Sequence, residues 1–333
     1  MEPSSPAQEQ VLASGGLPPL EQVRDDVWAL AQPMPGGHLA YSYAYLLRAS
    51  DGAAHVIDPG WDSDENLDRL TGALRTVAPG GTLATITGTH LHPDHVGLAA
   101  RLRAASGASI AMHDVERSTL ESHDGREANP EDSWSRLEGW GVPEERRREL
   151  TLHLDRSPAD LTLAVDHGLT DGDVLPIPGF TLTVMATPGH TAGHICLRDD
   201  DRGLLLTGDH VLPNVVAGLG LGGATTSNAL ADYLVSIDRV SRFPDHEALP
   251  GHGYRFRGLP ERAAACAEHH LSRTREVAAV LARADVRPPT VWEIAGQLTW
   301  TAGWDGLHGH HLLSALAQTE MHRDYVRTVG APG

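Results

Sequence analysis

Four side chains of types that bind metal ions fall within six residues, in the segment HLHPDH at residues 90–95. An apolar run ends there, which is typical of a strand. On an extended chain His90 and His92 point to the same side. The turn and helix start that follow can direct Asp94 and His95 toward a second point. The segment therefore predicts a metal site at the end of a strand.

Three further candidate ligands occur where other predicted strands end. Each has a neighbouring glycine, which permits close approach of the backbone: His190, Asp209 and His252. Together the candidates make five histidines and two aspartates. That set exceeds what one tetrahedral zinc ion takes. It is enough for two metal ions that share one bridging carboxylate.

The elements that must position these ligands alternate between strand and helix. Hydrophobic periodicity predicts strands at 28–34, 41–49, 53–60, 82–90 and 109–113, and helices at 64–78 and 95–107. This order predicts helices packed on the faces of a sheet.

The second half of the chain returns to strands after an interruption. The charged residues 114–160 are expected to form short helices and loops that cap a pocket. From residue 161, Asp-Gly and Pro-Gly turns predict hairpins. A helix is expected at 228–243, with Asn228 as its N-cap, and a last short strand at 248–253.

The chain is expected to divide near residue 260. Residues 26–258 would form the metal-binding domain, and the composition of residues 261–333 predicts a small helical C-terminal domain. Residues 1–25 lack the basic start and apolar core of a secretory signal and are expected to be a flexible extension. No run approaches the roughly 18 apolar residues that span a bilayer, so no membrane association is expected.

Charge and composition exclude several chemistries. The net charge is −18, and all 26 basic residues are arginine. Without lysine, no Schiff-base or lysine-nucleophile mechanism is possible, and so acidic a chain disfavours nucleic acid as a partner. The two cysteines, Cys196 and Cys266, are too few for a disulfide framework and fit a reducing cytoplasm.

By these motifs, residues 25–258 resemble the metallo-β-lactamase fold superfamily, of the binuclear hydrolase type. The resemblance implies an α+β fold, the αβ/βα sandwich, with the metals at one edge between two sheets. The segments NALADYLVSIDRV and PGHGYRFRG and the helical tail are similar to a subgroup related to β-lactamase-like protein 2, whose C-terminal domain is winged-helix-like. Glyoxalase II-like proteins share the metal motif, but their glutathione-binding features are not recognisable here.

The resemblance also implies roles for individual residues. Its first metal would be held by His90, His92 and His190, its second by Asp94, His95 and His252, with Asp209 bridging the two. Asp58 resembles the family's aspartate that orients a ligand histidine through a hydrogen bond. His194 and His210 lie near ligands in the sequence and are expected to support them. Asp94 has a second possible catalytic role, which is to orient the hydroxide.

The substrate pocket is less clearly marked. Tyr41, Tyr43 and Tyr45 alternate and therefore share one face of a strand. They form either a packing stripe or part of a substrate pocket. His113, beside the expected insertion, is a further candidate for the pocket wall.

The ligand set predicts a metal-dependent hydrolase. Two divalent ions can hold a bridging hydroxide that attacks a carbonyl. An imidazole-rich site favours zinc, with manganese or iron as alternatives. We expect a small acyl substrate, namely a thioester, an ester or a lactone.

Other functions would use the same residues differently. An endoribonuclease or phosphodiesterase would need a basic groove, for which Arg255, Arg257 and Arg262 are the candidates. An iron-dependent sulfur dioxygenase would bind one iron at the same motif. A DNA-binding role for the C-terminal domain would leave the ligand set unexplained. The helical tail is also a candidate homodimer interface.

Overall fold

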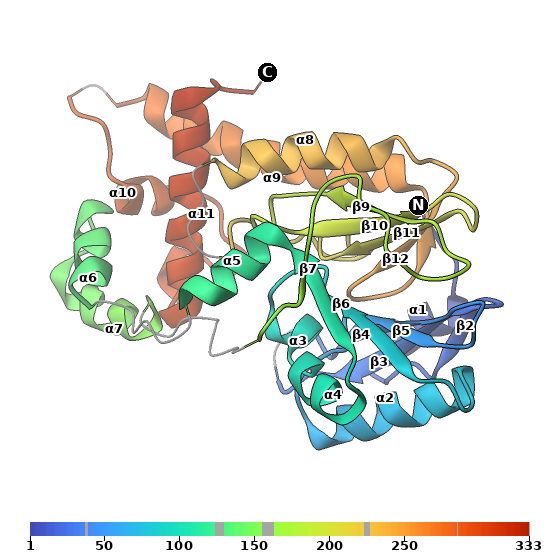
Figure 1. The fold of residues 1–333 in the computed structure, drawn as a ribbon. Coiled ribbons are helices and arrows are strands. Elements are labelled where there is room, and N and C mark those ends of the chain that lie inside the picture. The colour runs from blue at the N-terminus through green and yellow to red at the C-terminus, as the bar shows by residue number, and fades with distance from the viewer. Residues whose placement is uncertain (37–38, 124–129, 155–162, 223–226, 285, 333) are drawn as a thin grey trace.

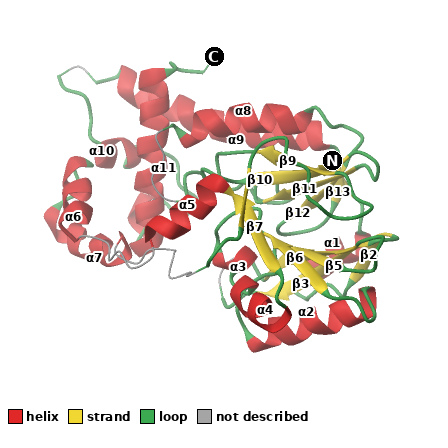
Figure 2. Cartoon of the chain, viewed as in Figure 1, coloured by secondary structure: helices red, strands yellow, loops and turns green. Residues whose placement is uncertain are grey.

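The computed structural model describes residues 1–36, 39–123, 130–154, 163–222, 227–284 and 286–332. Two sheets face each other, and helices cover the outer side of each (Figures 1 and 2). This is the αβ/βα sandwich expected from the sequence. The metal-binding motifs lie on loops at one edge of it.

The first sheet has seven strands in sequence order, antiparallel from β2 to β5 and parallel from β5 to β8. They are β2 (Glu21–Arg24), β3 (Val27–Pro33), β4 (Tyr41–Arg48), β5 (Ala54–Ile57), β6 (Leu83–Thr87), β7 (Ser109–His113) and β8 (His167–Leu169). Its outer face packs against α2 (Asp64–Val77), α3 (Pro93–Val96) and α4 (Ala99–Ser106). The predicted strands and the helix at 64–78 are therefore present.

The second sheet has the order β1-β13-β12-β11-β10-β9. Its strands are β1 (Glu2–Pro3), β13 (Phe256–Arg257), β12 (Glu247–Pro250), β11 (Leu204–Gly208), β10 (Ile195–Asp199) and β9 (Leu182–Ala186). Helices α8 (Ala229–Ser241) and α9 (Leu259–Ala282) cover it. The Asn228 side chain accepts hydrogen bonds from the backbone of Leu230 and Ala231, so it caps α8 as predicted.

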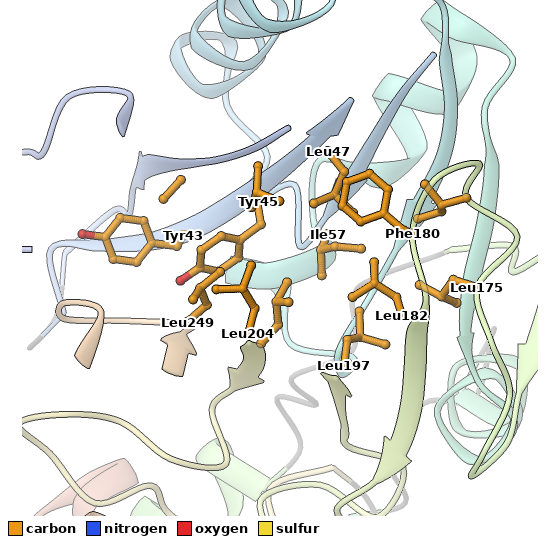
Figure 3. Close-up of a cluster of buried hydrophobic side chains, with 14 of the residues drawn as sticks. Tyr43, Tyr45, Leu47, Ile57, Leu175, Phe180, Leu182, Leu197, Leu204 and Leu249 are labelled. Carbon is orange, nitrogen blue, oxygen red and sulfur yellow. The ribbon is translucent and has the colours of Figure 1, made fainter. Parts of the chain in front are cut away.

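An apolar core fills the space between the sheets (Figure 3). Leu47 and Ile57 come from the first sheet and meet Leu182 and Leu197 from the second. Because each strand alternates its side chains between two faces, the same strands also bury residues under the helices. One apolar layer lies between the sheets, and one lies between each sheet and its helices. Together they hold the loops at the edge in place.

The helix expected at 95–107 is divided in two. The N–H of Leu98 donates to the carbonyl of Gly60 at 2.9 Å, so it is not used within the helix. The Asp94 carbonyl, its partner in a continuous helix, accepts instead from the Ser42 hydroxyl at 2.6 Å. The break separates α3 from α4 and ties the ligand-bearing turn to the sheet.

The extension expected at residues 1–25 is packed against the sheets rather than loose. Strand β1 pairs with β13, and helix α1 (Pro6–Ser14) follows it. The Ser4 hydroxyl donates to the buried Glu247 carboxylate at 2.6 Å. Gln8 is buried, and its side chain accepts from the Arg255 backbone at 3.0 Å. Two residues are too short a strand to be predicted from alternation.

Part of the expected insertion and part of the C-terminal tail form one helical unit. Helices α5 (Asp114–His123), α6 (Pro130–Gly139) and α7 (Glu144–Leu154) belong to the insertion, of which 124–129 and 155–160 lie outside the described residues. Helices α6 and α7 pack with α10 (Val291–Ala295) and α11 (Gly309–Thr328) around a shared apolar cluster, with a short 3-10 helix (Trp304–Gly306) between them. The Trp140 indole donates to the Glu320 carboxylate at 2.7 Å.

For the described part of the insertion, this arrangement corrects the expectation that it caps a pocket. Helices α6 and α7 pack against the C-terminal helices, and α5 contacts the metal-binding loops through Glu116. Within 259–284 and 286–332 the structure has helices and no strand, so the winged-helix likeness does not extend to a wing. Among the described residues, no helix has both the length and the apolar character that crossing a bilayer requires.

Candidate metal centre

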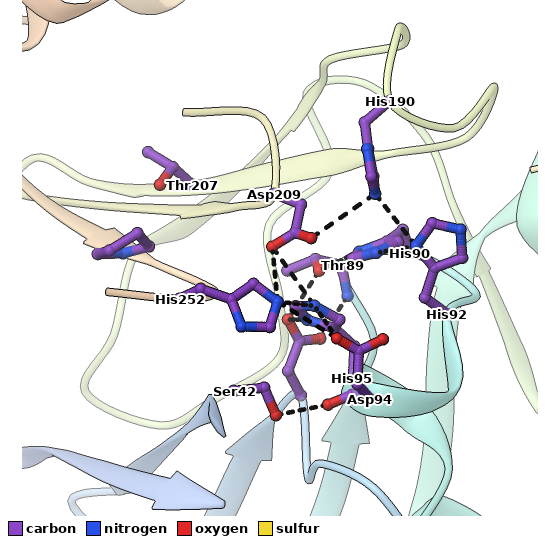
Figure 4. Close-up of polar contacts among 12 residues, drawn as sticks. Ser42, Thr89, His90, His92, Asp94, His95, His190, Thr207, Asp209 and His252 are labelled. Carbon is purple, nitrogen blue, oxygen red and sulfur yellow. Dashed lines mark hydrogen bonds and ion pairs between the residues drawn. The ribbon is translucent and has the colours of Figure 1, made fainter. Parts of the chain in front are cut away.

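The seven candidate ligands come together at the edge between the two sheets (Figure 4). They form three overlapping groups whose ligand atoms lie within 4.8 Å of one another: His90, His92 and His190; His90, His95 and Asp209; Asp94, His95 and His252. The ligands come from the loop after β6, the start of α3 and the turns after β9, β11 and β12. Strands of both sheets therefore contribute.

The inner nitrogens of these imidazoles face one another at short distances. His92 Nδ1 lies 2.9 Å from His90 Nε2 and 3.1 Å from His190 Nε2. On the other side, His95 Nε2 lies 3.3 Å from His252 Nε2. Imidazoles gathered so closely need either shared protons or a cation among them.

Two of the imidazoles are oriented by a loop. His190 Nδ1 lies 2.7 Å from the Gly218 carbonyl, and His92 Nε2 lies 2.9 Å from the Leu221 carbonyl. A carbonyl only accepts, so each outer nitrogen carries the proton and the inner nitrogen presents a lone pair. We call His92 and His190 the loop-held ligands, and residues 212–222 the site loop.

Two other imidazoles are oriented from the first sheet. His95 Nδ1 lies 2.9 Å from the Asp58 carboxylate, just after β5, and His252 Nδ1 lies 2.7 Å from the Tyr41 carbonyl on β4. We call His95 and His252 the sheet-held ligands. His90 is held through Thr89, whose hydroxyl lies 3.0 Å from its Nδ1.

Asp209 lies between the two groups of histidines. Its Oδ1 is 3.4 Å from the Nε2 atoms of both sheet-held ligands, and its Oδ2 is 3.7 Å from His190 Nε2. Buried Oδ1 has no hydrogen-bond partner among the described residues. A buried carboxylate oxygen without a donor is expensive unless a cation binds it. The donor set thus fits two divalent ions bridged by Asp209.

The two ligand pairs differ in proton affinity. Burial lowers the pKa of His190 to about 4 and also lowers that of His92. Burial also acts to lower the pKa of His252, but the carboxylates of Asp209 and Asp94 raise it to about 9. Carboxylates likewise outweigh burial at His95 and raise its pKa well above the usual range. In the metal-free protein, the sheet-held pair therefore holds protons more tightly than the loop-held pair does.

Comparison with known proteins agrees with this geometry. The family model described as the metallo-beta-lactamase superfamily matches residues 39–252, which include all seven ligands. The chain belongs to the metallo-beta-lactamase superfamily.

Two relatives and one solved structure illustrate the similarity. A β-lactamase-like protein 2 homologue of Caenorhabditis elegans is 23% identical over 79% of this chain and 73% of its own. The acyl-coenzyme A thioesterase MBLAC2 of Bos taurus is 30% identical over 56% of this chain and 61% of its own. The structure of a β-lactamase domain protein from Burkholderia ambifaria covers 93% of this chain and 88% of its own, with 24% identity and a TM-score of 0.76.

Asp58 supports the metal centre through hydrogen bonds to two positions next to or among the ligands. Its carboxylate accepts from the Thr89 backbone and hydroxyl, each at 2.7 Å, besides facing His95. It is also the one non-glycine residue described with a positive φ, at 52°. Aspartate tolerates that conformation better than most residues. The backbone is thus bent to aim one carboxylate at two ligand-bearing positions.

His194 and His210 lie behind the centre rather than in it. His194 Nε2 accepts from the Asp209 backbone N–H at 3.1 Å, and its Nδ1 lies 2.9 Å from the Thr187 hydroxyl. His194 therefore orients the residue that bridges the ligand groups. The His210 ring packs beside that of Tyr233 at an interplanar angle of 59°, with ring centroids 4.8 Å apart.

The two tyrosines proposed for a substrate pocket are packing residues, whereas the pocket role of His113 stays a prediction. Tyr41 and Tyr43 are buried in the core between the sheets, and both hydroxyls donate to the Gly253 carbonyl. With Tyr45, which donates to Pro250, they brace the turn that carries His252. His113 is half-buried at the end of β7, where its Nδ1 accepts from the Val115 backbone. The packing alternative for the tyrosines is the one observed.

Several functional contacts carry no sequence signal. The Gly218 and Leu221 carbonyls are backbone groups, so residue type does not reveal them. Arg262 on α9 donates to the Leu212 and Val215 carbonyls at 2.6 and 2.5 Å and so holds the site loop. Glu116 on α5, a single glutamate in a charged helix, reaches the ligand-bearing loops from outside the motifs.

Proposed function

We propose that this chain is a hydrolase of small acyl substrates, namely thioesters, esters or lactones, that works with two zinc ions. The observation that carries the proposal is the set of inner nitrogens that face one another, with the Asp209 carboxylate between them. Two bound ions would supply a hydroxide nucleophile at neutral pH and a positive charge for the oxyanion. The chain supplies their spacing.

A thioester is the substrate that fits the proton chemistry of the site best. Burial acts to raise the pKa of Asp94, but the facing His95 and His252 lower it to about 2. The pKa of Asp209 is also held well below its usual range, because the same histidines outweigh its burial. Neither carboxylate is a ready proton donor, and a thiolate leaves without one more easily than an alkoxide. The name of the bovine relative, a thioesterase, agrees with this choice.

The arginines considered for a nucleic-acid groove are otherwise engaged. Arg255 is buried between the carboxylates of Glu21 and Glu247. Arg262 is bound to carbonyls of the site loop, and Arg257 donates to the Asp245 carbonyl at 2.9 Å. Phosphate contacts need free cationic side chains. These contacts support a small-molecule substrate over RNA.

We also propose that the protein is cytoplasmic. Cys196 and Cys266 are both free and buried, as suits a reducing compartment. A homodimer through the C-terminal helices stays a prediction, and a monomeric mass in light scattering would contradict it.

The deciding experiment combines metal analysis with a substrate panel. Protein purified without added metal should contain about two zinc ions per chain. It should hydrolyse acyl-thioesters, p-nitrophenyl esters or lactones, and the Asp209→Ala variant should not. Salt-sensitive cleavage of RNA would instead favour the phosphodiesterase. One iron per chain, with oxygen consumed on a persulfide, would overturn the hydrolase.

A further inference from the structure

A buried carboxylate links the two loops that carry the loop-held ligands. Glu116 Oε2 accepts from the Leu91 backbone N–H at 2.9 Å, and Oε1 accepts from the Gly193 N–H at 2.6 Å. Leu91 stands between His90 and His92, and Gly193 follows His190 by three residues. Each oxygen of one side chain therefore holds a different ligand-bearing loop.

The carboxylate has no cationic partner to offset its burial. It is 1% exposed, and no ion pair of Glu116 occurs among the described residues. Burial raises the pKa of Glu116 to about 7, although the hydrogen bonds from the Gly193 and Leu91 backbone act to lower it. A buried carboxylate held only by hydrogen bonds is unfavourable for stability compared with an apolar side chain. Its presence at this position calls for a role other than stability.

The turn after His190 is shaped around this carboxylate. A Cβ on Gly193 would lie 2.7 Å from Glu116 Oε1 and 2.8 Å from its Cγ. Such contacts are too close for any side chain at position 193 unless the turn or the carboxylate moves. Gly193 does not have a positive φ, so the requirement here is one of space. This steric fit is independent of the hydrogen bonds.

We propose that Glu116 is a positioning residue that sets the separation of His92 and His190, and through it the geometry of the first metal. Helix α5, from outside the metal-binding motifs, would thereby control the loop-held half of the centre. The inference rests on the metal-dependent function proposed above. Its test therefore uses metal binding, which can be read even if no acyl substrate is found.

The sharpest variant is Glu116→Gln. It keeps the size of the side chain but replaces one acceptor oxygen by an NH2 group, so one of the two N–H groups loses its partner. We expect cobalt(II) bound to this variant to give an altered d–d absorption spectrum. Affinity for the first metal should fall about 10- to 100-fold, as for other residues that orient ligands. With a substrate in hand, kcat should fall and KM should change little.

The matched control is Glu121→Gln, on the same helix and exposed to solvent. It should leave the cobalt spectrum, metal affinity and thermal midpoint at wild-type values. A folded Glu116→Gln protein with the wild-type spectrum and affinity would overturn the proposal. A wild-type protein that binds two metals but hydrolyses nothing would refute the acyl hydrolase and leave the role of Glu116 to be decided by the spectrum.

A second variant guards against loss of fold. Gly193→Ala keeps the carboxylate and moves the turn, so it should alter the same spectrum. If Glu116→Gln does not fold, this variant decides the question. If neither variant folds while Glu121→Gln does, Glu116 is a structural residue and the positioning role is wrong.

Discussion

The loop-held and sheet-held ligands present the same chemical group but are supported by different parts of the molecule. His95 and His252 lean on β4 and on the bend at Asp58, which are part of the sandwich core. His92 and His190 lean on carbonyls of the site loop. The difference teaches that one half of the centre is positioned by the first sheet and by Asp58. The other half is positioned by the site loop, which Arg262 on α9 holds in turn.

Proton affinity follows the same division. Three carboxylates surround His95 and raise its pKa. His190 has mainly histidine neighbours, and burial lowers its pKa. Metal ions must displace protons from the sheet-held pair more than from the loop-held pair. The two halves should therefore respond differently to mutation and to pH.

The largest effect is expected from removing the residue common to both halves. Asp209→Ala takes away the carboxylate that faces ligands on either side, so both metals should bind poorly. Activity should fall by about 10³-fold or more. Steady-state kinetics with elemental analysis would measure this, with the exposed Asp68→Asn on α2 as control. Retention of two tightly bound metals would show that Asp209 does not join the halves.

Asp58→Asn should affect the sheet-held half more strongly than the rest of the centre. Asparagine keeps the size of the side chain and tolerates the left-handed backbone. It replaces one oxygen that faces His95 and Thr89 with a donor. Affinity for the second metal should fall about 10- to 100-fold. Affinity for the first metal should fall less, because Asp58 reaches its ligand His90 through Thr89. Competition with a chelator would resolve the two affinities, and equal losses at both metals would contradict the division.

Acidity should separate the halves without any mutation. Because the metal-free pKa of His252 is raised to about 9, lowering the pH below that value adds a proton that the second metal must expel. Its affinity should decline about tenfold per pH unit for each proton released. The first metal should show no such slope at neutral pH, since His190 gains its proton only near pH 4. Calorimetric zinc titrations between pH 6 and 8.5 would test this, and parallel slopes would refute it.

The smallest effect is expected from Arg262→Met. Methionine keeps the apolar stem of the side chain but loses both hydrogen bonds to the site loop. The loop-held ligands should shift slightly, with affinity for the first metal reduced about 3- to 10-fold. Arg283→Met, exposed near the end of α9, is the control. If only the affinity for the second metal fell, Arg262 would act on the sheet-held ligands, which would contradict this prediction.

The metal ligands could be predicted from the sequence, because each stands at a strand end with a residue type that binds metals. The groups that orient these ligands could not be predicted. Backbone carbonyls such as Gly218 have no residue identity, and Glu116 has no spacing that separates it from a solvated helix face. Alternation placed the three tyrosines on one face, as observed, but not between the two sheets. That choice depends on long-range packing.

The shared cluster of α6, α7, α10 and α11 bears on how chains of this kind change by descent. Two segments far apart in the sequence bury each other's tryptophans and leucines. A protein that ended before α9 would expose Trp140 and Leu137 to solvent. A protein that lacked α6 would expose Leu312 and Leu316. An ancestral protein with one of the two segments and not the other would expose an apolar patch that favours aggregation. The two segments should therefore be inherited as a pair, either both kept or both absent.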